Sequence, residues 1–210
     1  IEFLPDATFV IDCDGKVIAW NRSMETMTGI PAKGMLGKGN YEYALPFYGE
    51  RRPILVDMVL SADEEIARRY TKIQRRGDVL FGETNSPRLG DRKENIYLAG
   101  TAAPLFDSQG NLVGAIESIR DITERKRAEE ALRYRDAILE VASFAAERFL
   151  KAPSWEMDIR EILARLGTVT NASRVYIFEN RISEEGALLS SQRYEWVADG
   201  IKPEIDNPAM

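Results

Sequence analysis

Short apolar runs separated by polar turns predict that the chain before residue 123 is rich in β-strands. The first two runs, 8–12 and 16–20, flank Asp14-Gly15, a residue pair that favours a tight hairpin turn. A turn that contains Gly110 joins the last two runs into a second predicted hairpin. The pattern therefore predicts five antiparallel strands, at residues 8–12, 16–20, 79–84, 95–106 and 112–122.

The residues between the second and third strands carry helix signals. Asn21 is a favoured N-cap, Gly29 suits a helix end, and Pro31 suits the start of a further helical turn. Residues 51–74 are predicted to form a longer helix, because four apolar residues recur on one face: Ile54, Leu55, Met58 and Val59. Strands at both ends with helices between them indicate an α+β domain built on an antiparallel sheet.

A different period begins at Thr123 and predicts a long helix over residues 124–150. Steps of three, four and seven residues separate its main apolar positions, which are Ala128, Ala131, Ile138, Ala142, Ala145 and Phe149. The stripe allows two interpretations, a helix packed on its own domain or a coiled coil with a second copy of the chain. We favour the coiled coil, because the helix is too long for the small domain that precedes it. Alanines and Arg135 make its seam weak, which suits a part that must shift.

The last part of the chain predicts one more helix and two strands. Pro153 ends the long helix, and residues 154–167 form the next one, with Ser154 as N-cap and Gly167 at its end. Strands follow at 174–180 and 188–197. Roughly sixty residues are too few for an independent sheet domain, so we expect this part to be cut short or to be completed by another copy.

Composition narrows the functions open to these elements. The 210 residues, 44% hydrophobic and 30% charged, describe an ordinary globular protein, and the net charge of −6 argues against a nucleic-acid partner. No run of 18 apolar residues exists, so no membrane contact is expected in this fragment. The chain begins at Ile1 rather than Met, so we expect an excised piece of a longer protein, and its one cysteine, Cys13, suggests a cytoplasmic protein without disulfides.

The sequence contains no histidine. This absence removes the commonest general base, the commonest zinc ligand, the usual haem ligand and any phosphoacceptor histidine, and no metal site is predicted. Paired carboxylates such as Asp12/Asp14 or Asp63/Glu64 could serve a hydrolase, but they lie in a predicted hairpin turn and at a solvated helix end, where charge is expected anyway. We therefore expect that this fragment is not an enzyme.

Three stretches together resemble a PAS domain over residues 1–123. They are DATFVIDCDGKVIAWN, MTGIPAKGMLGK and AAPLFDSQGNLVGAIESIRDITERK. The resemblance implies the PAS fold, with a five-stranded antiparallel sheet and flanking helices. From Asp136 onward, ILARLGTVTNASRVYIFENR and RYEWVADGI resemble the opening of a GAF domain, so residues 151–210 are expected to be its truncated α+β N-terminal part. The coiled-coil-like helix at 124–150 connects the two.

A PAS domain, a connecting helix and a GAF domain in this order are typical of sensor histidine kinases of two-component systems. The resemblance thus implies a cytoplasmic sensory, signal-transmission and dimerisation module, with a kinase domain downstream in the parent chain. A homodimer is expected through the 124–150 helix, with the PAS sheet as a second candidate surface. The alternative is a PAS domain that binds nothing and serves only for dimerisation and spacing.

The junction between the last predicted strand and the long helix is the expected signal relay. The resemblance implies that Asp121, Ile122 and Thr123 connect the strand to the output helix. The residues agree with this role, because no Gly or Pro interrupts the junction, Thr123 can cap the helix amides, and Glu124 lies where the helix dipole favours an anion. Asp121 can pair with a nearby arginine. The alternative is that these residues only cap the helix.

Strand parity predicts which side chains face the helices. In the usual PAS register, they form a candidate ligand pocket of Phe47, Leu98, Gly100, Ala102, Ala115, Glu117 and Ile119. The small residues among them leave room for a small molecule or for aromatic side chains such as Phe47 and Tyr43. An inward Glu117 needs a donor or a raised pKa; it can bind a ligand amine or hydroxyl, or pair with an arginine of residues 49–52. If the register slips by one residue, Glu117 instead faces water.

No cofactor is identified for this pocket. The absence of histidine argues against haem, and the absence of cysteine from residues 44–52 argues against a photoactive flavin. No cysteine lies beyond Cys13, so a bilin is not expected, and no ligand is assigned to residues 151–210. The identity of any small-molecule ligand stays open.

Overall fold

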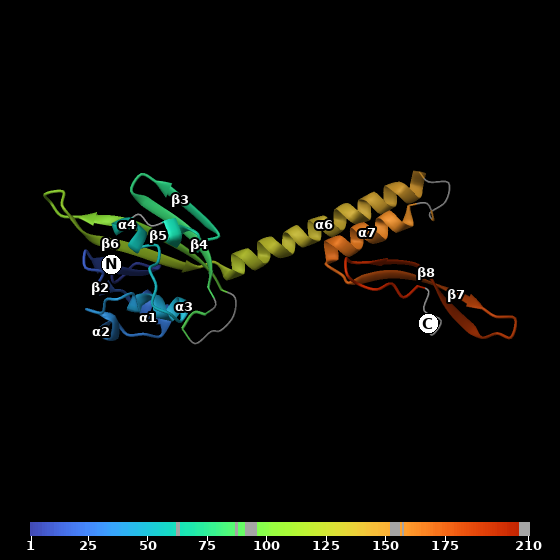
Figure 1. The fold of residues 1–210 in the computed structure, drawn as a ribbon, viewed down its shortest axis with the longest axis horizontal. Helices are drawn as coiled ribbons and strands as arrows, with labels where there is room; N and C mark the ends of the chain where they lie inside the picture. The colour runs from blue at the N-terminus through green and yellow to red at the C-terminus, as the bar shows by residue number, and fades with distance from the viewer. Residues whose placement is uncertain (62–63, 87, 91–95, 152–155, 157, 206–210) are drawn as a thin grey trace. The chain divides into compact units, whose positions relative to one another are not determined.

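The structure, a computed structural model, describes residues 1–205 except 62–63, 87, 91–95, 152–155 and 157. The chain divides into two compact units, Ile1–Lys126 and Arg127–Met210, which we call the N-terminal and the C-terminal unit (Figure 1). The boundary between them falls inside one helix, and each unit is described by itself.

The N-terminal unit is built on an antiparallel sheet of six strands in the order β2-β1-β6-β5-β4-β3. The strands are β1 Ala7–Asp12, β2 Val17–Trp20, β3 Lys72–Arg76, β4 Val79–Ser86, β5 Ile96–Phe106 and β6 Leu112–Asp121. The five predicted strands are all present, and β3 is an addition. Strand β6 lies between β1 and β5 in the sheet interior, so the strand that leads out of the unit is paired on both sides.

The predicted helix over residues 51–74 is wrong, and β3 explains why. The described part of this segment forms only two short helical turns, α4 Asp57–Leu60 and α5 Glu64–Ala67, before β3 begins. Gly77 has a φ of 59° and forms a two-residue hairpin loop with Asp78, which pairs Arg76 with Val79. The hairpin loop therefore holds residues 72–76 as a strand against β4, although the apolar spacing of the segment predicts a helix.

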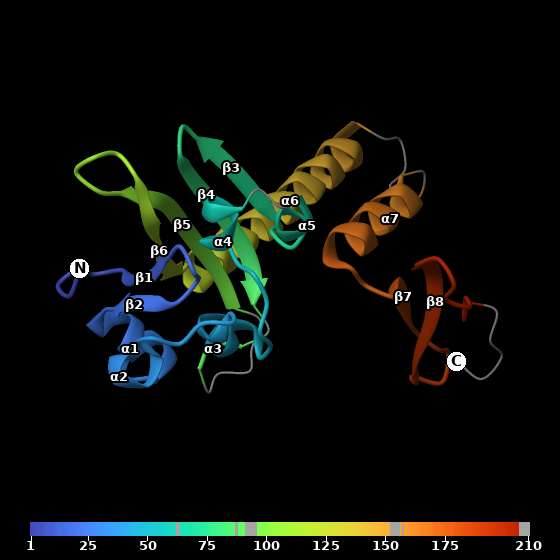
Figure 2. The same cartoon turned by 60° about the vertical axis from the view of Figure 1, so that its left-hand side comes forward.

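Short helices cover one face of the sheet, beside β1 and β2 (Figure 2). They are α1 Arg22–Thr28, α2 Ala32–Met35, the 3-10 turn η1 Glu42–Ala44 and α3 Leu45–Tyr48. As predicted, Asn21 caps α1 and Gly29 ends it in the left-handed conformation. The Asn21 side-chain oxygen accepts hydrogen bonds from both Thr8 N and Met24 N at 2.9 Å, which ties the first hairpin to the first helix.

The core of the N-terminal unit lies between these helices and the inner face of the sheet. Its largest fully buried side chains are aromatic or aliphatic, together with one methionine: Phe9, Ile11, Met24, Tyr43, Phe47, Ile54, Leu55 and Ile96. Phe9 contacts both Trp20 and Tyr43, with ring centroids 5.8 and 5.2 Å apart. The inner face is thus filled by the protein's own rings.

Helix α6 Thr123–Lys151 begins directly after β6, with only Ile122 between the two elements. It spans the predicted range of 124–150 as a single 29-residue helix. Among the residues that the structure describes, no helix combines the length and the apolar character that a membrane crossing needs.

The C-terminal unit contains most of α6, helix α7 Ile159–Thr170 and a hairpin of β7 Arg174–Ile182 and β8 Leu188–Val197. Pro153 and Ser154, expected to end one helix and start the next, lie outside the described residues. Helix α7 does not end at Gly167 as predicted but continues to Thr170 and ends at Asn171, whose φ is 51°. Gly167 instead makes room for Trp196, because an added Cβ would lie 2.0 Å from its ring.

Candidate functional site

The residues of the predicted ligand pocket lie in the interior of the N-terminal unit. Phe47 on α3 and the strand residues Leu98, Ala102, Ala115, Glu117 and Ile119 are buried. Gly100 belongs to the same inner face, since a Cβ added there would lie 2.8 Å from Glu117 Oε1 and 3.0 Å from Leu55 Cδ2. The structure therefore brings these residues together, whereas a ligand-binding role for them stays a prediction.

Glu117 is a carboxyl group enclosed by the core. It lies on β6, is 3% exposed, and its Oε2 accepts a hydrogen bond of 3.0 Å from Val56 N. The register that would expose it to water is not the one in the structure. Its partner is a backbone amide and not an arginine of residues 49–52; Arg52 lies over the Tyr48 ring, 3.6 Å from the centroid.

The enclosure changes the protonation of Glu117. Burial raises its pKa to about 8, the hydrogen bond from Val56 opposes this rise, and the nearby charge of Asp57 adds to it. The carboxyl group is therefore mostly protonated near pH 7, unlike an exposed glutamate.

Glu117 is one of two side chains whose hydrogen bonds hold the turn before α4. Asp57 Oδ2 accepts from Ile54 N at 2.7 Å, and Glu117 Oε2 accepts from Val56 N. Burial raises the pKa of Asp57, and the hydrogen bonds from Ile54 and Tyr43 oppose the rise. The amides of Ile54 and Val56 are thus both bound by carboxyl groups, one of which belongs to the strand that leads to α6.

Two facing glycines make the space for these groups. Gly82 on β4 and Gly100 on β5 are directly paired across the sheet. The Tyr70 ring lies against Gly82, where an added Cβ would be 2.8 Å from Tyr70 Cδ1, and Glu117 lies against Gly100. The small residues of the inner face therefore accommodate the protein's own side chains.

The junction between β6 and α6 is tied to β5 by hydrogen bonds. Asp121 Oδ1 accepts from Thr123 N at 2.9 Å, and Thr123 Oγ1 accepts from Tyr97 N at 3.0 Å. Ile122 N donates to Tyr97 O at 2.8 Å, and both Ile122 and Thr123 are buried. The Thr123 hydroxyl thus accepts from the Tyr97 amide of β5 and not from a helix amide as expected. The amide of Thr123 itself donates to Asp121.

The first turn of α6 is also tied to β4. Glu83 accepts from Arg125 Nη2 at 3.0 Å and lies 2.7 Å from Lys126 Nζ. These two cations lower the pKa of Glu83. The helix start is therefore attached to two neighbouring strands by backbone, hydroxyl and charged contacts.

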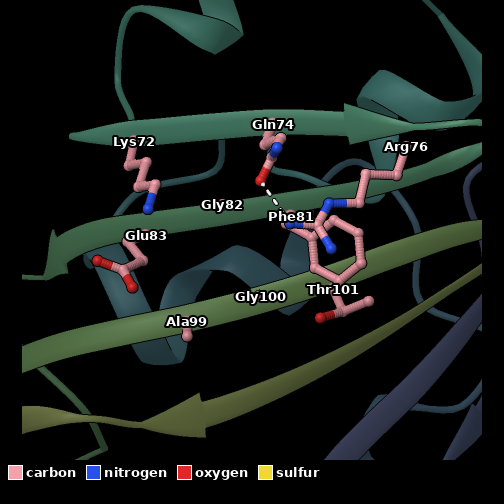
Figure 3. A pocket seen from close by; sticks show the side chains of 9 residues that line it. All are labelled: Lys72, Gln74, Arg76, Phe81, Gly82, Glu83, Ala99, Gly100 and Thr101. Atoms are coloured by element: carbon pink, nitrogen blue, oxygen red, sulfur yellow. Dashed lines mark hydrogen bonds between the residues drawn. The ribbon is translucent and has the colours of Figure 1, made fainter.

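A hollow of about 210 Å³ lies on the outer face of the same sheet (Figure 3). Its lining comes from β3, β4 and β5: Lys72, Gln74, Arg76, Phe81, Gly82, Glu83, Ala99, Gly100 and Thr101. A second, larger hollow of about 520 Å³ lies beside it, where β5 and β6 meet the start of α6. Ala99 and Thr101 line both hollows.

The sequence of this unit matches a known family. The sequence model of the PAS fold family covers residues 1–127, which is more than half of the chain. The chain belongs to the PAS family. Its residues are also 31% identical, over 208 positions and 98% of the chain, to the methanogenesis regulatory histidine kinase FilI of Methanothrix harundinacea (strain 6Ac). The match spans only 21% of that kinase's length.

Solved PAS domains are similar to this chain. The PAS domain of a protein from Colwellia psychrerythraea is 20% identical, with 59% of this chain and 91% of that chain covered and a TM-score of 0.40. The PAS domain of Bordetella pertussis BvgS is also 20% identical, with 63% and 88% covered and a TM-score of 0.40.

The other site predictions for the PAS unit have separate outcomes. Asp12 Oδ1 accepts from Asp14 N and Lys16 N, which is the local role expected in a hairpin turn. Asp63 lies outside the described residues. Within the described residues, no three side chains of His, Cys, Asp or Glu gather as metal ligands do.

Sequence reasoning missed two features of the PAS unit. Glu83 was not recognised as an anchor of α6, because its partners Arg125 and Lys126 lie more than forty residues later in the chain. The outer hollow was missed because the sequence pattern predicts a helix over residues 51–74, where the structure has β3. The Gly77-Asp78 pair, a hairpin signal, could have revealed both the strand and the hollow beside it.

Proposed function

We propose that the chain is a sensory and signal-transmission module of a sensor histidine kinase, in which residues 1–123 sense, residues 124–150 transmit, and catalysis belongs to another part of the parent protein. Its membership of the PAS family and its similarity to a regulatory histidine kinase support this assignment. The absence of histidine means that this chain cannot itself carry a phosphohistidine.

The observation that carries the proposal is the junction at Asp121, Ile122 and Thr123. No loop separates the interior strand β6 from α6, and hydrogen bonds fasten the first helical residues to Tyr97 on β5. A strand and a helix joined in this way move together, so a small shift of β6 becomes a movement of the helix.

Glu117 supplies a route from the helical face of the sheet to this junction. Its hydrogen bond to Val56 joins the turn before α4 to β6, four residues before Asp121. A ligand or partner that moved this turn would therefore act directly on the relay strand. The candidate ligand residues remain Phe47, Leu98, Gly100, Ala102, Ala115, Glu117 and Ile119.

A second candidate function is a ligand-free PAS module for dimerisation and spacing. The filled inner face favours it, since Tyr43 and Phe47 are fully buried and Glu117 and Leu55 lie over Gly100. In this version the PAS core binds no internal ligand and serves to hold the neighbouring domains at a fixed spacing.

Helix α6 is the proposed dimer contact in both versions. Leu132 and Leu139, seven residues apart, are 50% and 55% exposed, whereas Val141 is buried and Phe144 lies under the Arg165 guanidinium at 3.8 Å. Apolar residues thus remain accessible along the helix to a second copy. The PAS sheet is a second contact surface in this proposal, residues 151–210 are the truncated start of a GAF domain, and the module is cytoplasmic.

A chimeric kinase tests the relay. This chain would replace the matching 21% of the Methanothrix kinase, and the rate of autophosphorylation would be measured with and without Thr123→Val. We expect the variant to change the basal rate by about fivefold or more, because the helix start loses one of its attachments to β5. Thr26→Val, at an exposed position on α1, is the matched control.

The outcome separates relay from spacing. A Thr123→Val chimera that folds, dimerises and phosphorylates at the rate of the unmodified chimera would contradict the relay proposal. A change of rate in the Thr26→Val control of the same size would also contradict it, because the effect would then not belong to the junction.

A further inference from the structure

The outer hollow combines positive charge with an apolar wall. Lys72 and Arg76 project into it from β3, and Phe81, which is 37% exposed, forms the wall on β4 (Figure 3). The Arg76 guanidinium lies 5.6 Å from the centroid of the Phe81 ring and donates to Gln74 Oε1 at 3.3 Å. The hollow therefore offers cations at both ends of a small apolar surface.

Lys72 and Arg76, the two cations of β3 that line the hollow, have no acidic partner among the described side chains. Lys72 is directly opposite Glu83 in the sheet, but the carboxylate of Glu83 binds Arg125 and Lys126 of α6. Lys72 and Arg76 make no ion pair within the part of the chain that the structure describes. Their positive potential is notable in a protein with a net charge of −6, and it favours an anion at this place.

The floor of the hollow suits a flat apolar group. Ala99 and Thr101 present short side chains on β5, and Gly82 and Gly100 present bare backbone. A planar ring can lie on this floor and pack against Phe81 either edge-to-face or offset-stacked, the two arrangements that aromatic pairs prefer. The guanidinium of Arg76 can contact the face of such a ring as well.

We propose that this outer hollow binds a small aryl carboxylate, whose carboxylate group meets Lys72 and whose ring lies against Phe81 beside the Arg76 guanidinium. Lys72 and Arg76 are four residues apart on one strand, which is about 13 Å along β3. Their side chains lean into the hollow from both ends, so an acid of the size of phenylacetate fills the space between them. The volume of about 210 Å³ admits one such molecule.

The site lies on the face of the sheet opposite to the buried carboxyl of Glu117. The proposal that this hollow binds a ligand does not rest on the relay proposed above. The hollow does lie beside the relay, because Glu83 lines the hollow and also binds the first turn of α6.

The test is a titration of the whole chain with phenylacetate, followed by amide chemical shifts in NMR spectra. We expect saturable shifts that are centred on Gly82, Ala99 and Gly100. Acetate, which has no ring, and phenethylammonium, which has the opposite charge, should give much smaller shifts. Raising the salt concentration should weaken binding, because the cations are exposed.

Variants assign the binding to the hollow. Lys72→Gln should weaken binding about fivefold, the upper range for an exposed ion pair, and Phe81→Leu should weaken it roughly threefold. Arg75→Gln is the matched control, since Arg75 carries the same charge on the same strand but does not line the hollow. Melting curves should show that all three variants fold.

Three results would overturn the proposal. The first is the absence of saturable shifts in the hollow, and the second is an equal loss of binding in Lys72→Gln and Arg75→Gln. The third is a shift of the same amides with protein concentration alone, which would assign this part of the sheet, and not only the rest of it, to the contact with a second copy of the chain. None of them involves kinase activity, so the relay is tested independently by the chimera.

Discussion

Two glutamates on opposite faces of one sheet show how the setting decides what a carboxyl group does. Glu117 is enclosed by the core, and burial raises its pKa to about 8. Glu83 lies on the outer side next to two cations of α6, which lower its pKa. The inner group holds the turn before α4, and the outer group holds the start of α6. We therefore expect that changes on the inner face lower the free energy of unfolding, and that loss of Glu83 loosens the start of α6 with little change in that free energy.

Removing an inner aromatic ring should give the largest effect. Phe47→Ala is expected to lower the free energy of unfolding by about 3–5 kcal/mol, because Phe47 is fully buried and removal of its ring leaves a cavity in the core. Phe81→Ala on the outer face should lower it by about 1 kcal/mol or less. Chemical denaturation measures both values. Equal losses in the two variants would remove the contrast between the faces.

The pH dependence of stability is the next largest expectation. The folded pKa of Glu117 lies above its unfolded value of 4.5, so its contribution is present in full below about pH 4.5 and is lost as the pH rises through about 8. Relative to Glu117→Gln, the free energy of unfolding of the unmodified chain should fall by about 3 kcal/mol between pH 5 and pH 8. This fall is smaller than the maximum of about 1.4 kcal/mol per pH unit, because Glu117 begins to ionise in the folded chain as the pH approaches 8. Denaturation at several pH values measures this difference.

Glu83→Gln is the control for that measurement. Its pKa is lowered and not raised, so stability from this group is present above the normal pKa of 4.5 and is lost only at lower pH. Between pH 5 and pH 8 the variant should follow the unmodified chain. A Glu117→Gln variant with the same pH profile as the unmodified chain would mean that the carboxyl group is not enclosed as the structure has it.

The elements that were predicted correctly are those with local signals. The hairpin at Asp14-Gly15 and the caps of α1 at Asn21 and Gly29 are determined by residues within a few positions of one another. The burial of Glu117 followed from strand parity, which needs only the register of β6.

The partners of the buried groups could not be predicted in the same way. Val56 and Glu117 are 61 residues apart, and their contact depends on how the whole helical segment packs on the sheet. The apolar period over Ile54 to Val59 does not continue along residues 60–74, which form a short helical turn and β3 instead of a longer helix. The loop at Gly77 was the stronger signal, since a hairpin fixes both of its strands.

The junction should give an intermediate effect. Thr123→Val removes the acceptor of Tyr97 N and leaves a partly buried amide without this partner, so the free energy of unfolding should fall by about 1–2 kcal/mol. Amide hydrogen exchange of Tyr97 should become faster than in the unmodified chain. Thr26→Val, whose hydroxyl lies at an exposed helix position, should change the free energy of unfolding by no more than about 0.5 kcal/mol and should leave Tyr97 exchange as it is. An unchanged Tyr97 exchange rate would show that Thr123 does not hold the strand.

The smallest effect on stability should come from Glu83, and it sharpens the contrast most. Glu83→Gln should change the free energy of unfolding by about 0.5 kcal/mol or less, because its ion pairs with Arg125 and Lys126 are open to solvent. The same variant should accelerate amide exchange in the first turn of α6, and added salt should reproduce this acceleration in the unmodified chain. Amide exchange of Val56, whose N–H is bound by the enclosed carboxyl of Glu117, should show no such response to salt. If salt and Glu83→Gln leave the first turn of α6 unchanged, the outer carboxylate does not fasten the helix, and the backbone contacts of Ile122 and Thr123 alone must hold the junction.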